Sequence, residues 1–323
     1  MAITSGTYSI GTTGDYTTPQ TFFDDLGTPL TAQVVGECQN QIFTGTFTCP
    51  AITTTATNNV VLTTVAGASF RDDTGNPLKL DTSAGSTLSN TNNYQRVLIF
   101  AAGTHMTVKG LQISKTGGAP YGALRGYDES KHFVDFCIVY GNAAAFDDVL
   151  IRFRNCLIIA VSGAYTILHS NSTTTLGPTF YACTLVMPSD LTAAVCFTIR
   201  YAGTTANTFY KNCAFFGWSG IKQTAFSSGA SDYNITDLSS GLDGANDLLS
   251  KTYGNQFNGT ATGASQDYKL KSGSDAIGTG VADATNYPTD IFGTTRADPP
   301  CMGCFEFVSS GNPRHGDMFF MGA

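Results

Sequence analysis

A short pattern of apolar and polar residues recurs five times in the middle of the chain. It reads "VKGLQI" around Leu111, then "VDFCIV", "FRNCLI", "FYACTL" and "YKNCAF" around four cysteines. The positions three before and two after the central residue are apolar in every copy. The position two before it is charged or amphipathic and is expected to face water: Lys109, Asp135, Arg154, Tyr181 and Lys211. Alternation with a period of two predicts one β-strand in each copy.

The spacing of the copies predicts a stack of coils. The central residues lie 26, 19, 27 and 30 residues apart, and a unit of this length cannot bury its own apolar face. Helical periodicity is nearly absent, and the turns are rich in Gly, Asn, Ser and Thr, which favours an all-β parallel β-solenoid. Like residues of successive coils then lie about 4.8 Å apart. Free cysteine packs as a small apolar residue, so one buried column of thiols is expected at Cys137, Cys156, Cys183 and Cys213.

The remaining segments suggest how the solenoid begins and ends. Residues 1–30 predict an N-terminal cap with a short helix that has Thr18 as its N-cap, Pro19 at its first position and Gly27 as its end. Residues 31–307 are assigned to the solenoid, with loops 70–95 and 114–131 expected to leave the coil. Residues 228–265 predict a winding segment with short strands. Residues 308–323 predict an extended C-terminal tail used in assembly.

Composition limits the classes of partner. A net charge of −7 and a pI of about 4.9 argue against nucleic acid. No window reaches the apolar length of a membrane span, and the start lacks the features of a signal peptide, so synthesis in a cytoplasm is expected.

Nine cysteines cannot all pair internally, and reduced thiols are expected. "CMGC" at Cys301 and Cys304 has no matching second pair, so we expect neither a metal nor a cofactor.

The sequence near the C-terminus resembles the closing segment of right-handed parallel β-helix proteins, the pectate-lyase-like superfamily. The matching stretches are "DYKLKSGSDAIGTG", "DIFGTTR" and "MGCFEF", within residues 267–307, and Cys304 replaces the small alanine that is usual there. "GDYTT" near the start and the "NC" pairs also resemble the family. The resemblance implies a right-handed parallel β-helix that ends in a strand at Phe305–Phe307. Since many unrelated functions use this fold, it implies little about activity.

A catalytic site is the alternative to a purely structural role. Family enzymes of this shape cleave polysaccharides, with an Arg or Lys base or with clustered carboxylates. The alternative catalytic set is Asp135, Asp147, Asp148 and Arg154. The simpler interpretation, which we prefer, is that the charges of the outer column pair between neighbouring coils on a solvated face. His169 could act as a base, but a structural role is expected.

The outer face also carries aromatic residues beside arginines. Phe133, Arg152, Tyr181 and Phe209 are predicted to form either a saccharide-binding face or a subunit interface. The C-terminal tail contains four apolar residues, which predict docking on a neighbouring subunit: Met318, Phe319, Phe320 and Met321.

Together these features favour a non-catalytic structural protein of a bacteriophage virion. The most specific form of this hypothesis is a capsid decoration (cement or knob) protein that forms a homotrimer and contacts the major capsid protein or another virion protein. The alternative is a tailspike-like depolymerase, or a glycan-binding β-helix, that acts on host surface polysaccharide.

Overall fold

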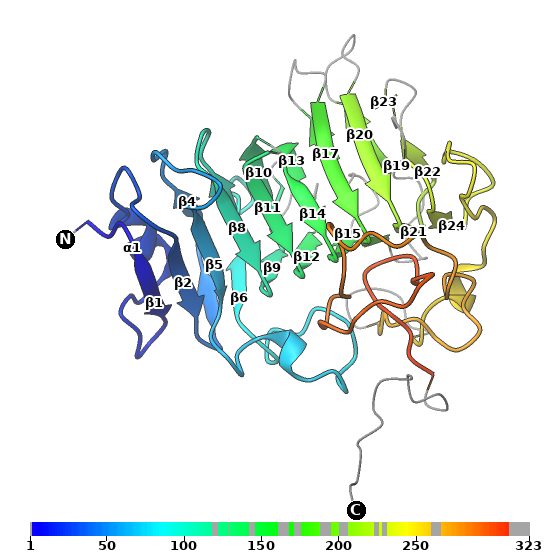
Figure 1. Ribbon diagram of the computed structural model, residues 1–323, viewed down its shortest axis with the longest axis horizontal. Coiled ribbons are helices and arrows are strands. Elements are labelled where there is room, and N and C mark those ends of the chain that lie inside the picture. The colour runs from blue at the N-terminus through cyan, green and yellow to red at the C-terminus, as the bar shows by residue number, and fades with distance from the viewer. Residues whose placement is uncertain are drawn as a thin grey trace, which may run out of the picture.

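The computed structural model contains a parallel β-helix built from three sheets (Figure 1). It describes residues 2–117, 122–128, 130–141, 146–160, 168–170, 176–187, 195–199, 206–222, 226–227, 231–259 and 266–309. The predicted docking residues of the tail therefore lie outside the described residues. No helix in the described ranges is long and apolar enough to cross a membrane.

Each complete turn of the β-helix contributes one strand to each sheet, the first and last turns contribute fewer, and the paired strands run parallel. The first sheet, in spatial order, consists of β1 (Gly6–Ile10), β2 (Val34–Cys38), β5 (Val60–Thr64), β8 (Met106–Lys109), β11 (His132–Asp135), β14 (Arg152–Arg154), β17 (Leu176–Tyr181), β20 (Ala206–Lys211) and β23 (Phe226–Ser227). The second consists of β3 (Ile42–Thr44), β6 (Thr87–Asn90), β9 (Gln112–Lys115), β12 (Ile138–Gly141), β15 (Leu157–Ala160), β18 (Thr184–Val186), β21 (Ala214–Phe216) and β24 (Ile235–Thr236). The third consists of β4 (Phe47–Cys49), β7 (Leu98–Phe100), β10 (Leu124–Tyr127), β13 (Phe146–Leu150), β16 (Leu168–Ser170), β19 (Val195–Ile199) and β22 (Gly220–Lys222).

The register confirms the columns predicted from the repeat. In the first sheet the inward column is fully buried and pairs in the predicted order: Val108, Val134, Phe153, Phe180 and Tyr210. In the second sheet the corresponding column is Ile113, Val139, Ile158, Leu185 and Phe215. The four predicted cysteines are fully buried at the corner between these sheets, and all nine cysteines of the chain are unpaired.

In each of the five repeat copies, one residue with a left-handed backbone makes the corner between the first and second sheets. The five corner residues precede the central position of the repeat: Gly110, Phe136, Asn155, Ala182 and Asn212, with φ between 49° and 72°. Glycine and asparagine adopt this conformation at low cost. The "NC" pair therefore has a geometric meaning, because Asn turns the chain and Cys fills the space inside the corner.

The N-terminal helix α1 (Pro19–Asp24) confirms the predicted cap and first residue, since Thr18 accepts a hydrogen bond from the backbone N–H of Thr21. The prediction that Gly27 ends the helix is wrong. Leu26 and Gly27 instead pair with Ile3, and the backbone N–H of Gly27 donates to the carbonyl of Ile3 at 2.7 Å. The helix packs closely on β2, where a Cβ on Gly36 would lie 2.9 Å from the ring of Phe22.

The two predicted loops are shorter than expected. The first leaves the coil around the 3-10 helix η1 (Phe70–Asp72), but Thr87–Asn90 returns as β6. The second contains β10 at Leu124–Tyr127, which pairs with its neighbours in the third sheet. These strands are polar or contain glycine, so the apolar periodicity of the sequence does not reveal them. Pairing with the strands of neighbouring coils holds them in place. The 228–265 prediction agrees with β24 and the 3-10 helix η2 (Tyr253–Asn255), although residues 228–230 and 260–265 are outside the described ranges.

The closing segment, residues 267–307, runs back along the flank of the β-helix instead of adding a strand to it (Figure 1). It covers the outer face of the second sheet and forms a second core there, which includes Ile138, Leu157, Ile159, Val186, Phe216, Leu270, Ile291, Met302 and Cys304. The predicted strand at Phe305–Phe307 is therefore wrong. The backbone N–H groups there bond to side chains instead of a neighbouring strand: that of Glu306 donates to the carboxylate of Asp290 at 3.0 Å, and that of Phe307 donates to the sulfur of Cys301 at 3.3 Å.

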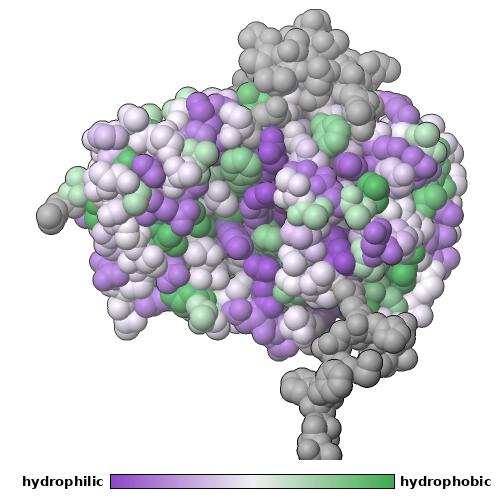
Figure 2. Space-filling model, in the orientation of Figure 1, coloured by the Kyte–Doolittle hydropathy of each residue, from purple (hydrophilic) through white to green (hydrophobic). Residues whose placement is uncertain are grey.

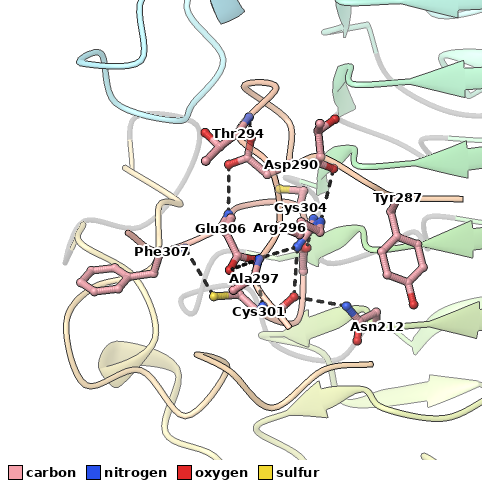
Figure 3. Close-up of polar contacts among 12 residues, drawn as sticks. Asn212, Tyr287, Asp290, Thr294, Arg296, Ala297, Cys301, Cys304, Glu306 and Phe307 are labelled. Carbon is pink, nitrogen blue, oxygen red and sulfur yellow. Dashed lines mark hydrogen bonds and ion pairs between the residues drawn. The ribbon is translucent and has the colours of Figure 1, made fainter. Parts of the chain in front are cut away.

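A buried arginine fastens the closing segment to the β-helix (Figure 3). Arg296 donates to the side-chain oxygen of Asn155 at 2.8 Å and to the carbonyls of Cys301 at 3.0 Å and Gly303 at 2.8 Å. Its guanidinium also lies 3.5 Å from the carboxylate of Glu306, and both side chains are almost completely buried. Asn212 adds further contacts, since its side chain accepts from the N–H of Val281 at 2.9 Å and donates to the carbonyl of Cys301 at 3.2 Å.

Candidate functional site

The outer face of the first sheet brings the predicted binding residues together. One outward column contains Phe133, Arg152, Thr179 and Phe209, which are paired in register on β11, β14, β17 and β20. The next outward column contains Lys109, Asp135, Arg154, Tyr181 and Lys211. Figure 2 shows hydrophilic residues gathered in the middle of this face, over β8, β11 and β14.

The prediction that the charged column lies in water is wrong for one residue. Asp135 is only 4% exposed, whereas Lys109 is exposed and Arg154 and Lys211 are half-buried. Arg154 lies on the neighbouring strand and reaches over the carboxylate, where its Nε donates to Oδ1 at 2.7 Å and its Nη2 bonds Oδ2. Pairing between coils was thus predicted correctly, but the long arginine side chain removes the carboxylate from water.

The alternative catalytic residues do not all lie on one sheet. Asp135 and Arg154 are on β11 and β14 of the first sheet, whereas Asp147 and Asp148 are on β13 of the third. Asp147 pairs in register with His169 on β16. The side chains of Asp147, Asp148 and His169 lie outside the described part of the structure. Asp135, held by Arg154, therefore lacks a described carboxylate partner on its own sheet.

Aromatic rings and guanidinium groups are stacked along this face. The guanidinium groups of Arg152 and Arg154 each lie 5.4 Å from the ring centre of Phe133. The rings of Tyr181 and Phe209 are 5.4 Å apart, and all of these side chains are half-buried. Partly exposed rings beside guanidinium donors are the kind of surface on which a saccharide ring or a partner protein can pack. We refer to Phe133, Arg152, Arg154, Tyr181 and Phe209 as the aromatic row.

The closing segment extends the aromatic row, which the sequence did not reveal. The ring of Tyr287 lies 6.2 Å from that of Tyr181, and Asp283 lies 4.0 Å from the ammonium group of Lys211. Beyond them is a largely apolar pocket of about 240 Å3, lined in part by Asp283, Tyr287 and Pro288. The repeat pattern carries no information about which irregular segment docks beside it, so no sequence signal pointed to these residues.

The buried histidine and the two cysteines of the "CMGC" motif lie inside the fold. His132 is buried, and burial lowers the pKa of its imidazole; its Nδ1 accepts from the backbone N–H of Tyr127 at 3.1 Å. Burial raises the pKa of the Cys301 thiol to about 11 and that of Cys304 to about 12. Among the described residues, no group of three or more His, Cys, Asp or Glu side chains is arranged to hold a metal ion.

Comparisons with known proteins give a likeness at the level of fold. No protein-family model and no curated protein matches the chain. A solved pectin methylesterase from carrot aligns with 77% of this chain and 90% of its own, at 12% identity and a TM-score of 0.45. A deglycosylated pectin methylesterase from Aspergillus niger aligns with 88% of this chain and 95% of its own, at 14% identity and a TM-score of 0.48. These enzymes have the right-handed parallel β-helix fold of the pectate-lyase-like superfamily, and at such identities the likeness concerns the fold alone.

Proposed function

We propose that this β-helix acts by binding rather than by catalysis. The observation that carries the proposal is the state of Asp135, the one carboxylate of the alternative catalytic set whose side chain lies within the described part of the structure. Arg154 binds both of its oxygens, and the carboxylate is withdrawn from solvent. A general base or a nucleophile must reach the substrate with a free oxygen. Asp135 has no such oxygen available, whereas the aromatic row presents surfaces suited to contact.

We further propose that the binding surface serves a bacteriophage virion, in which the chain is a capsid decoration protein that assembles as a homotrimer. The support comes from the sequence: a low share of charged residues on a repetitive β-solenoid, and four apolar residues in the C-terminal tail that would dock on a neighbouring subunit or on the major capsid protein. In this proposal the β-helix is a rigid spacer, the tail attaches it, and the virion is its location.

The virion proposal predicts a defined copy number and a role for the tail. Purified virions are expected to contain the chain in a fixed ratio to the major capsid protein. A variant that lacks residues 312–323 should fold but sediment with decoration-free particles much less than the full chain does. The deletion leaves the Arg296 contacts of the closing segment intact, so circular dichroism serves as the control for folding. A chain absent from virions, or a truncated variant that sediments as well as the full chain, would contradict the proposal.

Saccharide binding is the second candidate function, and the aromatic row favours it. Replacing both Phe133 and Phe209 with alanine is expected to weaken binding to host surface polysaccharide about tenfold, since each ring contributes about 0.5–1.5 kcal/mol. The matched control is Tyr94→Ala, which removes a ring that is 72% exposed and lies elsewhere on the surface. Retention on immobilised polysaccharide gives the affinity.

A second measurement with the same polysaccharide distinguishes binding from cleavage. Size-exclusion chromatography of the polysaccharide after incubation with the wild-type chain is expected to show an unchanged length. Shortened polysaccharide would favour the depolymerase alternative, and Asp147→Asn with Asp148→Asn would then be the first variant to examine. Equal retention of the double alanine variant and the Tyr94→Ala control would remove the aromatic row as a saccharide site.

A further inference from the structure

A polar pocket of about 330 Å3 opens where the loop around η1 meets the outer face of the first sheet. Its walls include two cations, one carboxylate, three hydroxyl groups and one ring: Arg71, Lys109, Asp72, Thr63, Thr64, Ser69 and Phe292. We infer that this pocket binds an oxyanion, namely the carboxylate, sulfate or phosphate group of a ligand of about monosaccharide size. The inference is independent of the functions proposed above.

The two cations of the pocket are held in place without an ion pair. The Nε of Arg71 donates to the carbonyl of Ile291 at 2.5 Å, and its guanidinium lies 4.3 Å from the ring centre of Phe136. The ammonium group of Lys109 lies 5.6 Å from the same ring. Within the described residues, no carboxylate forms an ion pair with Arg71 or Lys109. The terminal nitrogens of Arg71 and the ammonium of Lys109 thus remain available to a ligand.

The carboxylate in the pocket wall is already engaged. Oδ2 of Asp72 accepts the backbone N–H of Ser69 at 2.8 Å, which caps η1. Asp290 lies nearby, but it is buried and accepts hydrogen bonds from the backbone of Phe292, Thr294 and Glu306. Asp72, Asp135 and Asp290 all interact electrostatically with Arg71, but Asp135 is bound by Arg154 and the other two are held by backbone N–H groups. What the pocket offers a ligand is therefore the donor groups of Arg71 and Lys109, which form no ion pair within the described residues.

The ring of Phe136 lies beside both cations. Phe136 turns its corner with φ of 55°, and Tyr233 does the same at the corner before β24 with φ of 59°, so a bulky left-handed residue is not peculiar to this site. What is particular to Phe136 is its ring, which lies within cation–π distance of both Arg71 and Lys109. We interpret this ring as the means by which the two cations are positioned.

The hydroxyl groups complete a site for an oxygen-rich ligand. Thr63 and Thr64 are half-buried, and neither hydroxyl has a partner within the described part of the chain. Ser69 donates to the carbonyl of Gly110 at 2.9 Å and so fixes the loop against the corner. Guanidinium and ammonium donors bind oxyanions through charge-assisted hydrogen bonds, and hydroxyl groups supply the remaining contacts.

Isothermal titration calorimetry of the full-length chain tests the inference. The probes are sodium sulfate, sodium phosphate and sodium glucuronate, each compared with sodium chloride at equal ionic strength. At least one oxyanion is expected to bind at one site per chain, and the probe that binds best identifies the group. Lys109→Met should weaken it about tenfold or more, because a charge-assisted hydrogen bond is lost. Lys211→Met is the matched control, since it removes a cation from the same outward column, and should leave affinity unchanged.

A second variant guards against a purely electrostatic explanation. Phe136→Asn keeps a residue that accepts the left-handed backbone, so the fold is expected to survive, but it removes the ring beneath the two cations. Affinity should fall while the net charge stays the same. The inference is overturned if no oxyanion binds more tightly than chloride, if Lys109→Met and Phe136→Asn both bind like the wild type, or if Lys211→Met weakens binding as much as Lys109→Met.

Discussion

Replacing Arg296 with methionine is expected to lower the free energy of unfolding by about 3–5 kcal/mol, the cost of breaking a buried charge pair by removing one partner. The substitution leaves Glu306 buried and charged, with only the backbone N–H groups of Ala297 at 3.1 Å and Cys301 at 2.9 Å as donors among the described residues. It also leaves the side-chain oxygen of Asn155 and the carbonyl of Gly303 without the guanidinium. Urea unfolding followed by circular dichroism measures the loss, and limited proteolysis shows whether the closing segment detaches.

Two further variants give this prediction its controls. Lys251→Met removes a half-exposed cation that pairs with Asp275 at 3.1 Å, and it should cost no more than about 1 kcal/mol. Adding Glu306→Gln to Arg296→Met removes the unpaired charge and should restore part of the stability. If Arg296→Met costs no more than Lys251→Met, the closing segment is held by its apolar contacts alone.

Replacing Phe180 with alanine is the second large expected effect, with a loss of about 3–5 kcal/mol. The ring is fully buried and stacks on that of Phe153, with centres 5.0 Å apart and planes at 11°. The ring of Phe197 also lies 5.5 Å from that of Phe180. A cavity here opens in the middle of the stack, and the surrounding strands cannot close it because each is paired on both sides.

Phe209→Ala is the matched control for the buried ring. Phe209 stands on β20 with its ring half-buried on the outer face, so its removal creates no enclosed cavity. It should cost clearly less, since much of its surface is already in water. Urea unfolding of the two variants under identical conditions provides the comparison. Equal losses would mean that the interior stack contributes no more than the outer face does.

The repeat by itself determines the register of the β-helix. The columns from Val108 to Tyr210 and from Ile113 to Phe215 follow from the sequence because paired parallel strands place like positions directly above one another. The buried cysteines follow from the same alignment. A signal for the second core was also present, since the continuous apolar runs at Leu157–Ala160 and Ala214–Phe216 are typical of strands that are buried on both faces.

The candidate site was only partly predictable. The sequence placed Phe133, Arg152, Tyr181 and Phe209 on one face, and the structure brings them together there. It did not reveal that Arg154 withdraws Asp135 from water, because alternation assigns a residue to a face but not an exposure. The sequence also did not show that Asp135 lies on a different sheet from Asp147 and Asp148. Residues that are near each other in the sequence can belong to strands of different sheets.

What the sequence determined by itself is therefore the local and periodic part of the protein: the strands of the repeat, their register, the buried cysteine column and the start of the capping helix. What only the tertiary structure decided is where the irregular segments dock. Arg71 meets Ile291 across 220 positions of the chain, and Arg296 meets Asn155 across 141. Such contacts depend on how well the irregular segment fits the surface of the folded β-helix. The repeating pattern carries no information about that fit. The closure of the second core, the contacts of Arg296 and the polar pocket for which we propose oxyanion binding all arise from this docking.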